Sequence, residues 1–286
     1  MLGLEKKKFC TVESLCMSYY FGNRENEMEI SSFKFVMELN KKEGKQYTDV
    51  RFRKSRMPRY NGTVVLFHGF GANKVTMLMT AMYFRTMGFN VLIPDLLGHG
   101  ESSGKTSFGV RDAEIINEII DAQLSDHIKG KPIISLGQSL GAYAAMHLAK
   151  MRSDVDGILL MAPVADFNKS AIQYVRVFKP PFSSWLSDED VRQAAQGAIS
   201  DSNVETNALD MLSLIEKTVI PTLIMTSEID RITNSKDFAE LQGNHIKQVI
   251  WKMRAHVFTS AIDPKTHIEV MNWLDLHIKK QPYIYL

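Results

Sequence analysis

The chain has 286 residues, of which 45% are hydrophobic and 23% are charged, and its formal net charge is +2. This composition is typical of a globular protein and excludes a disordered, collagen-like or low-complexity chain. The near balance of charge also argues against a general nucleic-acid binder, although residues 1–60 carry 13 Lys/Arg and only 8 Asp/Glu.

The N-terminal part of the chain has the weakest pattern. Residues 1–30 show no clear element and are treated as an N-terminal extension of unknown role. Phe33–Leu39 and Tyr47–Phe52 are predicted strands on either side of a charged turn, Asn40–Lys45. The basic stretch 51–59 predicts a solvated hairpin edge, with a patch for anionic lipid or a partner protein as the alternative.

From residue 62 onward, short apolar runs alternate with segments of helical apolar spacing. The predicted strands are Thr63–Phe67, Val91–Ile93, Ile133–Leu136, Val155–Met161, Pro221–Met225 and Gln248–Trp251. The predicted helices are Val75–Met87, Ala113–Ile128, Leu140–Met151 and Lys265–Lys280. This alternation predicts an α/β fold with a mainly parallel central sheet flanked by helices on both faces.

One long segment breaks the alternation, because residues 166–217 separate two strands by far more than a single crossover requires. An insertion this long, with many apolar and aromatic residues, predicts a small helical cap over the site. We therefore divide the rest of the chain into an extension at 1–30 and a core at 31–165 and 218–286. The candidate substrate-binding residues of the cap are Phe178, Phe182 and Trp185.

A glycine-flanked serine is the first candidate for chemistry. The segment Gly137-Gln138-Ser139-Leu140-Gly141 follows the predicted strand Ile133–Leu136 and precedes an Ala-rich helix. A very sharp strand-to-helix turn would strain the serine backbone, and side chains two residues to either side would collide, so glycine is needed there. A flexible surface turn is the alternative, and the strand before and the helix after the motif argue against it.

A serine hydroxyl is a poor nucleophile until a base takes its proton. In this architecture the acid and then the histidine follow the serine, each just after a strand. His256 directly follows the predicted strand Gln248–Trp251 and is the predicted base. His245 precedes that strand, and His267 and His277 lie on the terminal helix, so these three fit the order less well.

Two carboxylates could orient this histidine. Asp230 follows the predicted strand Pro221–Met225 and is preferred, because strand, acid and downstream histidine then come in the expected order. Asp166 follows the preceding strand and is the alternative. Glu228 is close to Asp230 in sequence, and one of these two side chains is expected to be only solvated. The acid would hold the imidazole in the right tautomer and stabilise its protonated form.

The segment His68-Gly69-Phe70-Gly71 also follows a strand and precedes a helix. Its backbone N–H groups can point into the site, and the amides of Phe70 and Leu140 would form an oxyanion hole. Each donor of this kind stabilises the transition state by about 3 kcal/mol. A histidine at the position of His68 is more often a structural hydrogen-bonding residue, and we assign it no chemistry.

Taken together, these motifs resemble the α/β-hydrolase superfamily over about residues 60–280. The motifs that carry the resemblance are His68-Gly69-Phe70-Gly71, Asp95 with Gly98-His99-Gly100-Glu101-Ser102, Gly137-Gln138-Ser139-Leu140-Gly141, Asp230 and His256. The Gly-His-Gly-x-Ser loop and the cap position are most similar to the monoglyceride-lipase and serine-aminopeptidase-like branch. The resemblance implies a Ser139–His256–Asp230 triad with an oxyanion hole at Phe70 and Leu140.

The chain departs from the family pattern at three places. Ser227 stands where the family usually has glycine, and Ala255 replaces the glycine that usually precedes the catalytic histidine. Thr233-Asn234 replaces a common Thr/Val-Pro pair. These differences concern the geometry of the loops and leave the three reacting side chains in place.

We therefore expect a serine hydrolase that cleaves an acyl ester or thioester through an acyl-enzyme, on a substrate with an apolar acyl group. An acyltransferase or a peptidase could use the same triad, because the cap shape determines the acceptor. A catalytically silent hydrolase fold that only binds a protein or ligand is the alternative from another class.

No metal-ligand cluster, phosphate loop or dinucleotide fingerprint is present in the sequence, so neither a metal nor a cofactor is expected. The expected partner is a small-molecule acyl substrate, not nucleic acid. No apolar run reaches the ~18–20 residues that span a bilayer, and weak peripheral membrane contact is kept as an alternative. Cys10 and Cys16 cannot form a disulfide framework for a chain this long, which favours a reducing compartment and a cytoplasmic location.

Overall fold

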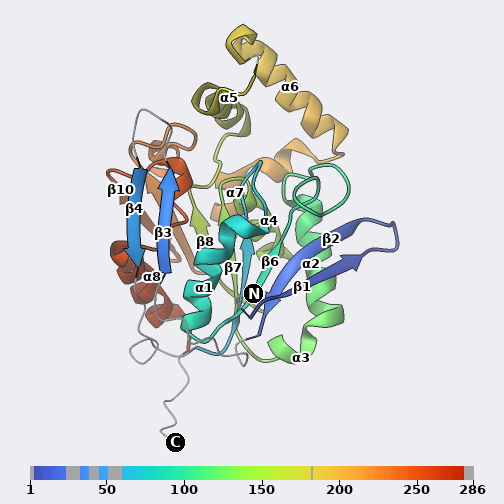
Figure 1. Cartoon of the computed structure of the whole chain (residues 1–286), viewed down its shortest axis with the longest axis vertical. Helices are drawn as coiled ribbons and strands as arrows, with labels where there is room; N and C mark the ends of the chain where they lie inside the picture. The colour runs from blue at the N-terminus through green and yellow to red at the C-terminus, as the bar shows by residue number, and fades with distance from the viewer. Residues whose placement is uncertain (1–2, 24–32, 39–44, 51–59, 182, 280–286) are drawn as a thin grey trace, which may run out of the picture.

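A central sheet carries the structure, and among the described residues it has eight strands in the order β1-β2-β6-β5-β7-β8-β9-β10 (Figure 1). The computed structural model describes residues 3–23, 33–38, 45–50, 60–181 and 183–279. The strands are β1 (Glu5–Cys10), β2 (Cys16–Gly22), β5 (Thr63–Phe67), β6 (Asn90–Pro94), β7 (Ile133–Gln138), β8 (Val155–Met161), β9 (Thr222–Ser227) and β10 (Ile246–Trp251). Only the pairs β1–β2 and β2–β6 of this sheet are antiparallel, which confirms the predicted mainly parallel α/β fold.

Helices cover both faces of the sheet. They are α1 (Leu78–Thr86), α2 (Val110–Gln123), α3 (Ser125–Ile128), α4 (Gly141–Met151) and α8 (Pro264–His277). Along β8, Ile158 and Leu160 pack into the core beneath α2 and α4, whereas Leu159 and Met161 pack into the core beneath α1 and α8. Because both faces are buried, the strands are continuously apolar instead of alternating.

The predicted helices are present with small changes at their ends. The segment predicted at Val75–Met87 begins as a short 3-10 helix, η2 (Lys74–Met77), and continues as α1. The segment predicted at Ala113–Ile128 is divided near Leu124 into α2 and α3.

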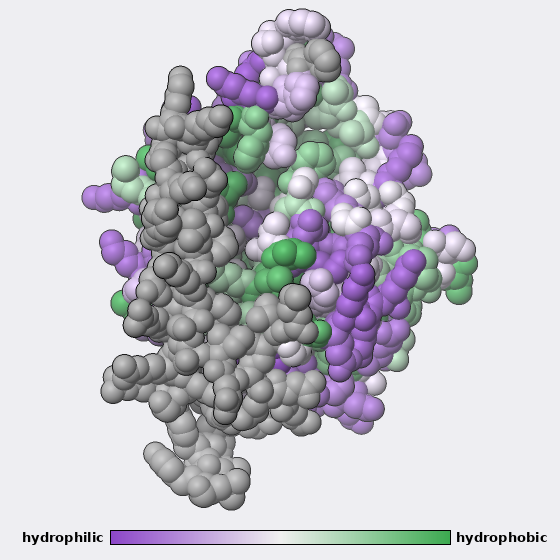
Figure 2. All heavy atoms as spheres, viewed as in Figure 1, coloured by the Kyte–Doolittle hydropathy of each residue, from purple (hydrophilic) through white to green (hydrophobic). Residues whose placement is uncertain are grey.

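Two strands of the central sheet, β1 and β2, lie within residues 1–30, the segment predicted as an N-terminal extension of unknown role. β1 is the edge strand and carries three consecutive lysines, a charge pattern that discourages pairing with another chain. Figure 2 shows hydrophilic side chains gathered over the part of this face where the β1–β2 hairpin lies. This lysine-rich strand has little apolar pattern, and for that reason it was not predicted from the sequence.

The next two strands form a separate sheet. The two strands predicted in this part of the chain are β3 (Phe33–Glu38) and β4 (Lys45–Val50), with somewhat different ends, and they pair antiparallel. The predicted basic hairpin edge at 51–59 lies outside the described residues.

A disulfide joins Cys10 and Cys16, which face each other across the β1–β2 pair. Two cysteines six residues apart did not predict this bond from the sequence. A disulfide is unexpected in a reducing compartment, where thiols are kept reduced, so the cytoplasmic location stays a prediction.

The segment predicted as the cap is helical and lies between β8 and β9. Its elements are α5 (Phe167–Phe178), η3 (Ser183–Trp185), α6 (Asp188–Asp201), η4 (Thr206–Leu209) and α7 (Met211–Lys217). Figure 1 shows α5 and α6 at the top of the view, above the central sheet. None of the helices within the described part of the chain is long and apolar enough to cross a membrane.

Candidate active site

Ser139 occupies the sharp turn between β7 and α4. Its backbone has a φ of 52°, a left-handed conformation that residues other than glycine rarely adopt. A Cβ at Gly137 would lie 2.3 Å from the carbonyl oxygen of Gly141, and a Cβ at Gly141 would lie 2.4 Å from that of Phe67. The two glycines are therefore required by close backbone approach, as the sequence analysis predicted.

A chain of hydrogen bonds connects Ser139 with the predicted base and acid. His256 follows β10 and Asp230 follows β9, so their loops meet at the same edge of the sheet as the serine turn. The Oγ of Ser139 lies 3.0 Å from His256 Nε2, and His256 Nδ1 lies 2.7 Å from Asp230 Oδ2. An ionised carboxylate only accepts, so Nδ1 carries the ring proton and Nε2 is left to accept from the serine hydroxyl.

The loop after β9 holds the Asp230 carboxylate in place. Its Oδ1 accepts hydrogen bonds from the backbone N–H groups of Ile232 (2.8 Å) and Thr233 (3.1 Å). The Thr233 hydroxyl donates to the other oxygen, Oδ2, at 2.9 Å. These three bonds fix the carboxylate orientation toward His256. In the sequence Thr233 stands out only as a departure from the family pattern, and this pattern does not predict its contact with Asp230.

The alternative acids have other roles. Asp166 is the N-cap of α5, where its side chain accepts a hydrogen bond from the backbone N–H of Lys169. Glu228 is exposed to solvent. Of the two acids that the sequence left open, the structure brings Asp230 to the histidine.

The other three candidate histidines have partners away from Ser139. The Nδ1 of His267 lies 2.9 Å from the Tyr83 hydroxyl, and His245 Nε2 lies 3.5 Å from a backbone carbonyl in α7. The ring of His277 packs against Trp273. Their positions agree with the choice of His256.

Ser227, at a usual glycine position, is fully buried at the end of β9. Its Oγ accepts a hydrogen bond of 3.2 Å from the backbone N–H of Arg254, two residues before His256. The serine therefore links the loop of the acid to the loop of the base.

The candidate oxyanion donors lie on either side of Ser139. Leu140 directly follows it at the start of α4, and a Cβ at Gly69 would lie 3.3 Å from the Ser139 Cβ, which places the Phe70 loop against the serine. Neither the Phe70 nor the Leu140 amide donates to another group within the described residues. Two free N–H groups beside a hydroxyl are the arrangement that an oxyanion would complete.

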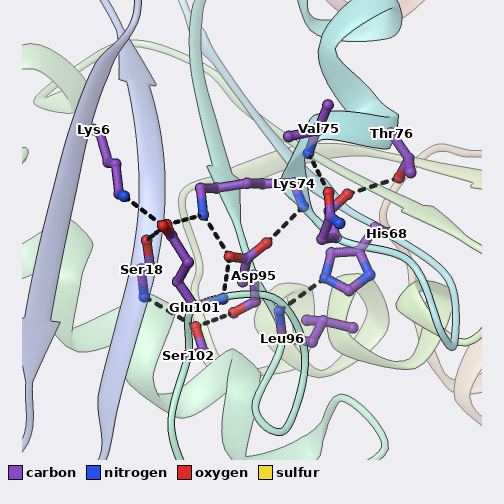
Figure 3. Close-up of polar contacts among 11 residues, drawn as sticks. Lys6, Ser18, His68, Lys74, Val75, Thr76, Asp95, Leu96, Glu101 and Ser102 are labelled. Carbon is purple, nitrogen blue, oxygen red and sulfur yellow. Dashed lines mark hydrogen bonds and ion pairs between the residues drawn. The ribbon is translucent and has the colours of Figure 1, made fainter.

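His68 is a structural residue, as predicted. Its Nε2 accepts a hydrogen bond of 2.9 Å from the backbone N–H of Leu96 (Figure 3). Its Nδ1 therefore carries the proton and donates to the carbonyl oxygen of Gly69 at 2.8 Å. Burial away from water lowers the pKa of His68 to about 4. The ring therefore stays neutral and keeps both bonds at neutral pH.

A pocket of about 650 Å³ opens beside Ser139 and His256. Much of its wall is apolar, and these side chains include Phe70, Val75, Leu78, Met79, Met82 and Val257. Helix α5 of the predicted cap closes one side with Tyr174 and Phe178, whose rings lie 4.6 Å apart.

The three substrate-binding candidates of the cap have different outcomes. Phe178 lines the pocket, whereas Phe182 lies outside the described residues. Trp185 is a correction, because it is 78% exposed on η3 and is not among the described residues that line the pocket. Tyr174 was missed as a lining residue: it is four residues before Phe178 and so shares its helical face, a spacing visible in the sequence.

Among the described residues, no group of three or more His, Cys, Asp and Glu side chains could hold a metal ion.

The family described as serine aminopeptidase, S33, matches residues 58–209, which is more than half of the chain. The matched region includes the serine turn and ends before Asp230 and His256. The assignment of these two residues therefore rests on their geometry.

Two curated relatives each align with 59% of the chain. The uncharacterized protein YqkD of Bacillus subtilis (strain 168) is 28% identical over 173 residues, and Lipase 3 of Moraxella sp. (strain TA144) is 26% identical over 204 residues. The chain spans only 55% of the length of the first relative and 62% of the second.

A solved esterase of Pyrococcus furiosus, Pf2001, is similar over 97% of this chain and 92% of its own, with a TM-score of 0.69 at 15% identity. The α/β hydrolase GrgF from Penicillium sp. sh18 is similar over 96% of this chain and 99% of its own, with a TM-score of 0.63 at 15% identity. Identities this low establish the fold alone, and the fold is that of the α/β-hydrolase superfamily, as the motifs predicted.

The buried neutral His68 predicts a pH-dependent stability. The His68 imidazole takes up a proton near pH 6.5 in the unfolded chain but only near pH 4 in the folded chain. Between these pH values the unfolded state therefore binds more protons, and the free energy of unfolding falls as the pH falls. We expect wild type to lose about 3 kcal/mol more unfolding free energy than His68→Gln between pH 7 and pH 4. Urea unfolding at each pH measures the unfolding free energy of both proteins. A difference between wild type and His68→Gln that is the same at pH 7 and pH 4 would contradict the prediction.

Proposed function

Because the chain belongs to the serine aminopeptidase (S33) family of α/β-hydrolases, we propose that it is a serine hydrolase acting on esters or thioesters with an apolar acyl group. The observation that supports this most directly is the continuous hydrogen-bond chain from Ser139 through His256 to Asp230. The chemistry that such a chain can perform is acyl transfer to serine and then to water.

In the first half of the proposed reaction, Ser139 Oγ attacks the acyl carbonyl carbon as His256 Nε2 takes its proton. The carbonyl oxygen becomes an oxyanion, to which the Phe70 and Leu140 amides donate hydrogen bonds. Asp230 stabilises the imidazolium that forms. His256 then gives the proton to the leaving alcohol or thiol, and the acyl group remains on Ser139.

In the second half, water takes the place of the leaving group. His256 accepts a proton from the water as the water oxygen attacks the acyl carbonyl, and the same two amides hold the second oxyanion. Return of the proton from His256 to Ser139 Oγ releases the carboxylic acid and restores the resting state. Both halves of the proposed reaction use the triad, the two backbone amides and water.

The pocket supports an apolar substrate. Its wall is built from aliphatic and aromatic side chains on α1, on the Phe70 loop and on α5. An aminopeptidase needs a negative group near the substrate ammonium, yet none of the described residues lining this pocket is acidic. The pocket therefore favours a neutral acyl chain over a peptide N-terminus, although the family takes its description from a peptidase.

The nucleophile assignment predicts that a fluorophosphonate probe labels wild type and fails to label Ser139→Ala. Hydrolysis of p-nitrophenyl butyrate should fall by at least about 10⁴-fold in the variant, because the acyl-enzyme cannot form. Ser125→Ala, at an exposed position at the start of α3, is the matched control and should keep both properties. Folded wild type that takes no label and hydrolyses no ester, thioester or amide would instead support a silent binding protein.

The acid assignment predicts different results for two aspartates. Asp230→Asn should lower kcat by about 10⁴-fold, because the amide no longer favours the tautomer with the proton on His256 Nδ1. Asp166→Asn should change kcat little, since asparagine caps a helix as well as aspartate does. Steady-state ester hydrolysis by both variants measures this, and the reverse order of effects would assign the acid to Asp166.

The substrate class predicts a dependence on acyl length. With p-nitrophenyl esters, kcat/KM should rise from acetate to hexanoate as the chain fills the pocket, and Phe178→Ala should reduce this gain by about tenfold. The activity on acetate should change little, because a short acyl group does not reach α5. Equal rates for acetate and hexanoate in wild type would show that the pocket does not bind the acyl chain.

A further inference from the structure

We propose that the buried ion pair of Lys74 and Asp95 is a positioning device for the oxyanion loop, which we define as residues 69–73. This inference rests on the proposed hydrolase function, because the loop carries the amide of Phe70. It assigns a role in the reaction to residues that have no contact with the proposed substrate pocket or with Ser139.

Lys74 is a cation in the interior, with 3% of its surface exposed. Its Nζ lies 2.5 Å from Asp95 Oδ2, whose side chain is fully buried, and 2.7 Å from Glu101 Oε2 (Figure 3). Burial lowers the pKa of Lys74, but the hydrogen bonds to both carboxylates outweigh this effect and raise it above the ordinary value. Lys74 is therefore charged at any pH at which the protein functions.

A buried ion pair is a poor way to stabilise a fold. Removing two charges from water costs free energy that their attraction only partly returns, and apolar side chains of similar volume often stabilise a protein as well or better. We therefore assign the Lys74–Asp95 pair a role in positioning the backbone. Because Lys74 directly follows residue 73, the backbone that it positions is the oxyanion loop.

The Asp95 carboxylate holds the C-terminal end of the oxyanion loop. Its Oδ1 accepts from the backbone N–H of Lys74, the residue directly after the loop, at 2.7 Å. Its Oδ2 accepts from the backbone N–H of Glu101 at 2.8 Å as well as from the Lys74 ammonium. One carboxylate thus ties two separate backbone segments together, and Lys74 neutralises its charge.

The N-terminal end of the oxyanion loop is held through Leu96, the residue that follows Asp95. Leu96 directly follows Asp95, and its N–H donates to His68, whose ring donates in turn to Gly69. The loop is therefore anchored on both sides of Phe70 to the backbone around Asp95. Because an oxyanion hole depends on donor position to within a fraction of an ångström, anchoring both ends is what the Phe70 amide requires.

The N-terminal hairpin supports the far side of this network. The Oγ of Ser18, on β2, donates to Glu101 Oε2 at 3.1 Å, and Lys6, on β1, donates to Glu101 Oε1 at 2.5 Å. Hydrogen bonds from Lys6 and then Lys74 lower the pKa of Glu101 to about 2, so it stays an anion. The strands that the sequence left without a role thus hold a partner of Lys74.

The test compares three variants with wild type. Lys74→Met removes the cation and leaves Asp95 unpaired, which endangers folding, so the main variant is the double substitution Lys74→Met with Asp95→Asn. The double variant has no uncompensated buried charge and nearly the same volume, but its amide cannot accept from both backbone segments as the carboxylate does. Lys247→Met is the control, because its partly exposed ion pair with Glu269 joins β10 to α8 and does not belong to this network.

Three measurements apply to the folded proteins. Hydrogen exchange of a peptide that covers residues 68–74 reports whether the loop is held. Hydrolysis of p-nitrophenyl butyrate separates kcat from KM. The third measurement is the affinity for two ketones. Addition of the serine hydroxyl to an alkyl trifluoromethyl ketone forms an oxyanion, so its affinity reports the oxyanion hole, whereas the affinity for the matching alkyl methyl ketone reports pocket binding alone.

In the double variant we expect faster exchange of this peptide, kcat lower by about 10-fold to 100-fold, and KM within about twofold of wild type. The affinity for the trifluoromethyl ketone should fall by the same factor as kcat, while that for the methyl ketone should not change. A structural role alone would lower the melting temperature and leave kcat and the ratio of the two ketone affinities unchanged.

Unchanged exchange, or unchanged kcat and inhibitor ratios in an active folded double variant, would overturn this inference alone. Equal losses in the Lys247→Met control would overturn it too, because the effect would not then belong to the buried pair. Wild type that hydrolyses no ester and binds no trifluoromethyl ketone would instead overturn the proposed function.

Discussion

The tight backbone approach around Ser139 is the constraint on which the site depends. Side chains at Gly137 or Gly141 would collide with backbone carbonyls, and Ser139 is held at a positive φ. This geometry turns the serine side chain out of the sheet and leaves the Leu140 amide at the start of α4. The strain is local, and the packed strand and helix on either side maintain it.

The parallel sheet then brings distant parts of the chain to this turn. The loops after β5, β7, β9 and β10 all follow strands that end at one edge, so they supply the oxyanion loop, the hydroxyl, the carboxylate and the imidazole. Each loop is also fixed by its own polar contacts: Thr233 holds Asp230, Ser227 links to the loop of His256, and Asp95 holds the segment around Phe70. The side chains are therefore in position before any substrate arrives.

The sequence predicted the features that depend on local pattern. The apolar strands, the glycine-flanked serine and the order of acid and base along the chain pointed to Ser139, Asp230 and His256, and hydrogen bonds join these three side chains in the structure. Features set by contacts between distant segments gave no such signal. The pairing of the lysine-rich β1 with β2 and the burial of Lys74 against Asp95 depend on register and loop path, and the exposure of Trp185 depends on how η3 packs.

The most direct test of the account is a crystal structure of the protein after reaction with an alkyl phosphonate ester. The account predicts a covalent bond from phosphorus to Ser139 Oγ, with the phosphoryl oxygen within hydrogen-bond distance of both the Phe70 and Leu140 amides and the alkyl chain between α1 and α5. A phosphonate attached to another side chain, or one whose phosphoryl oxygen faces away from both amides, would contradict it.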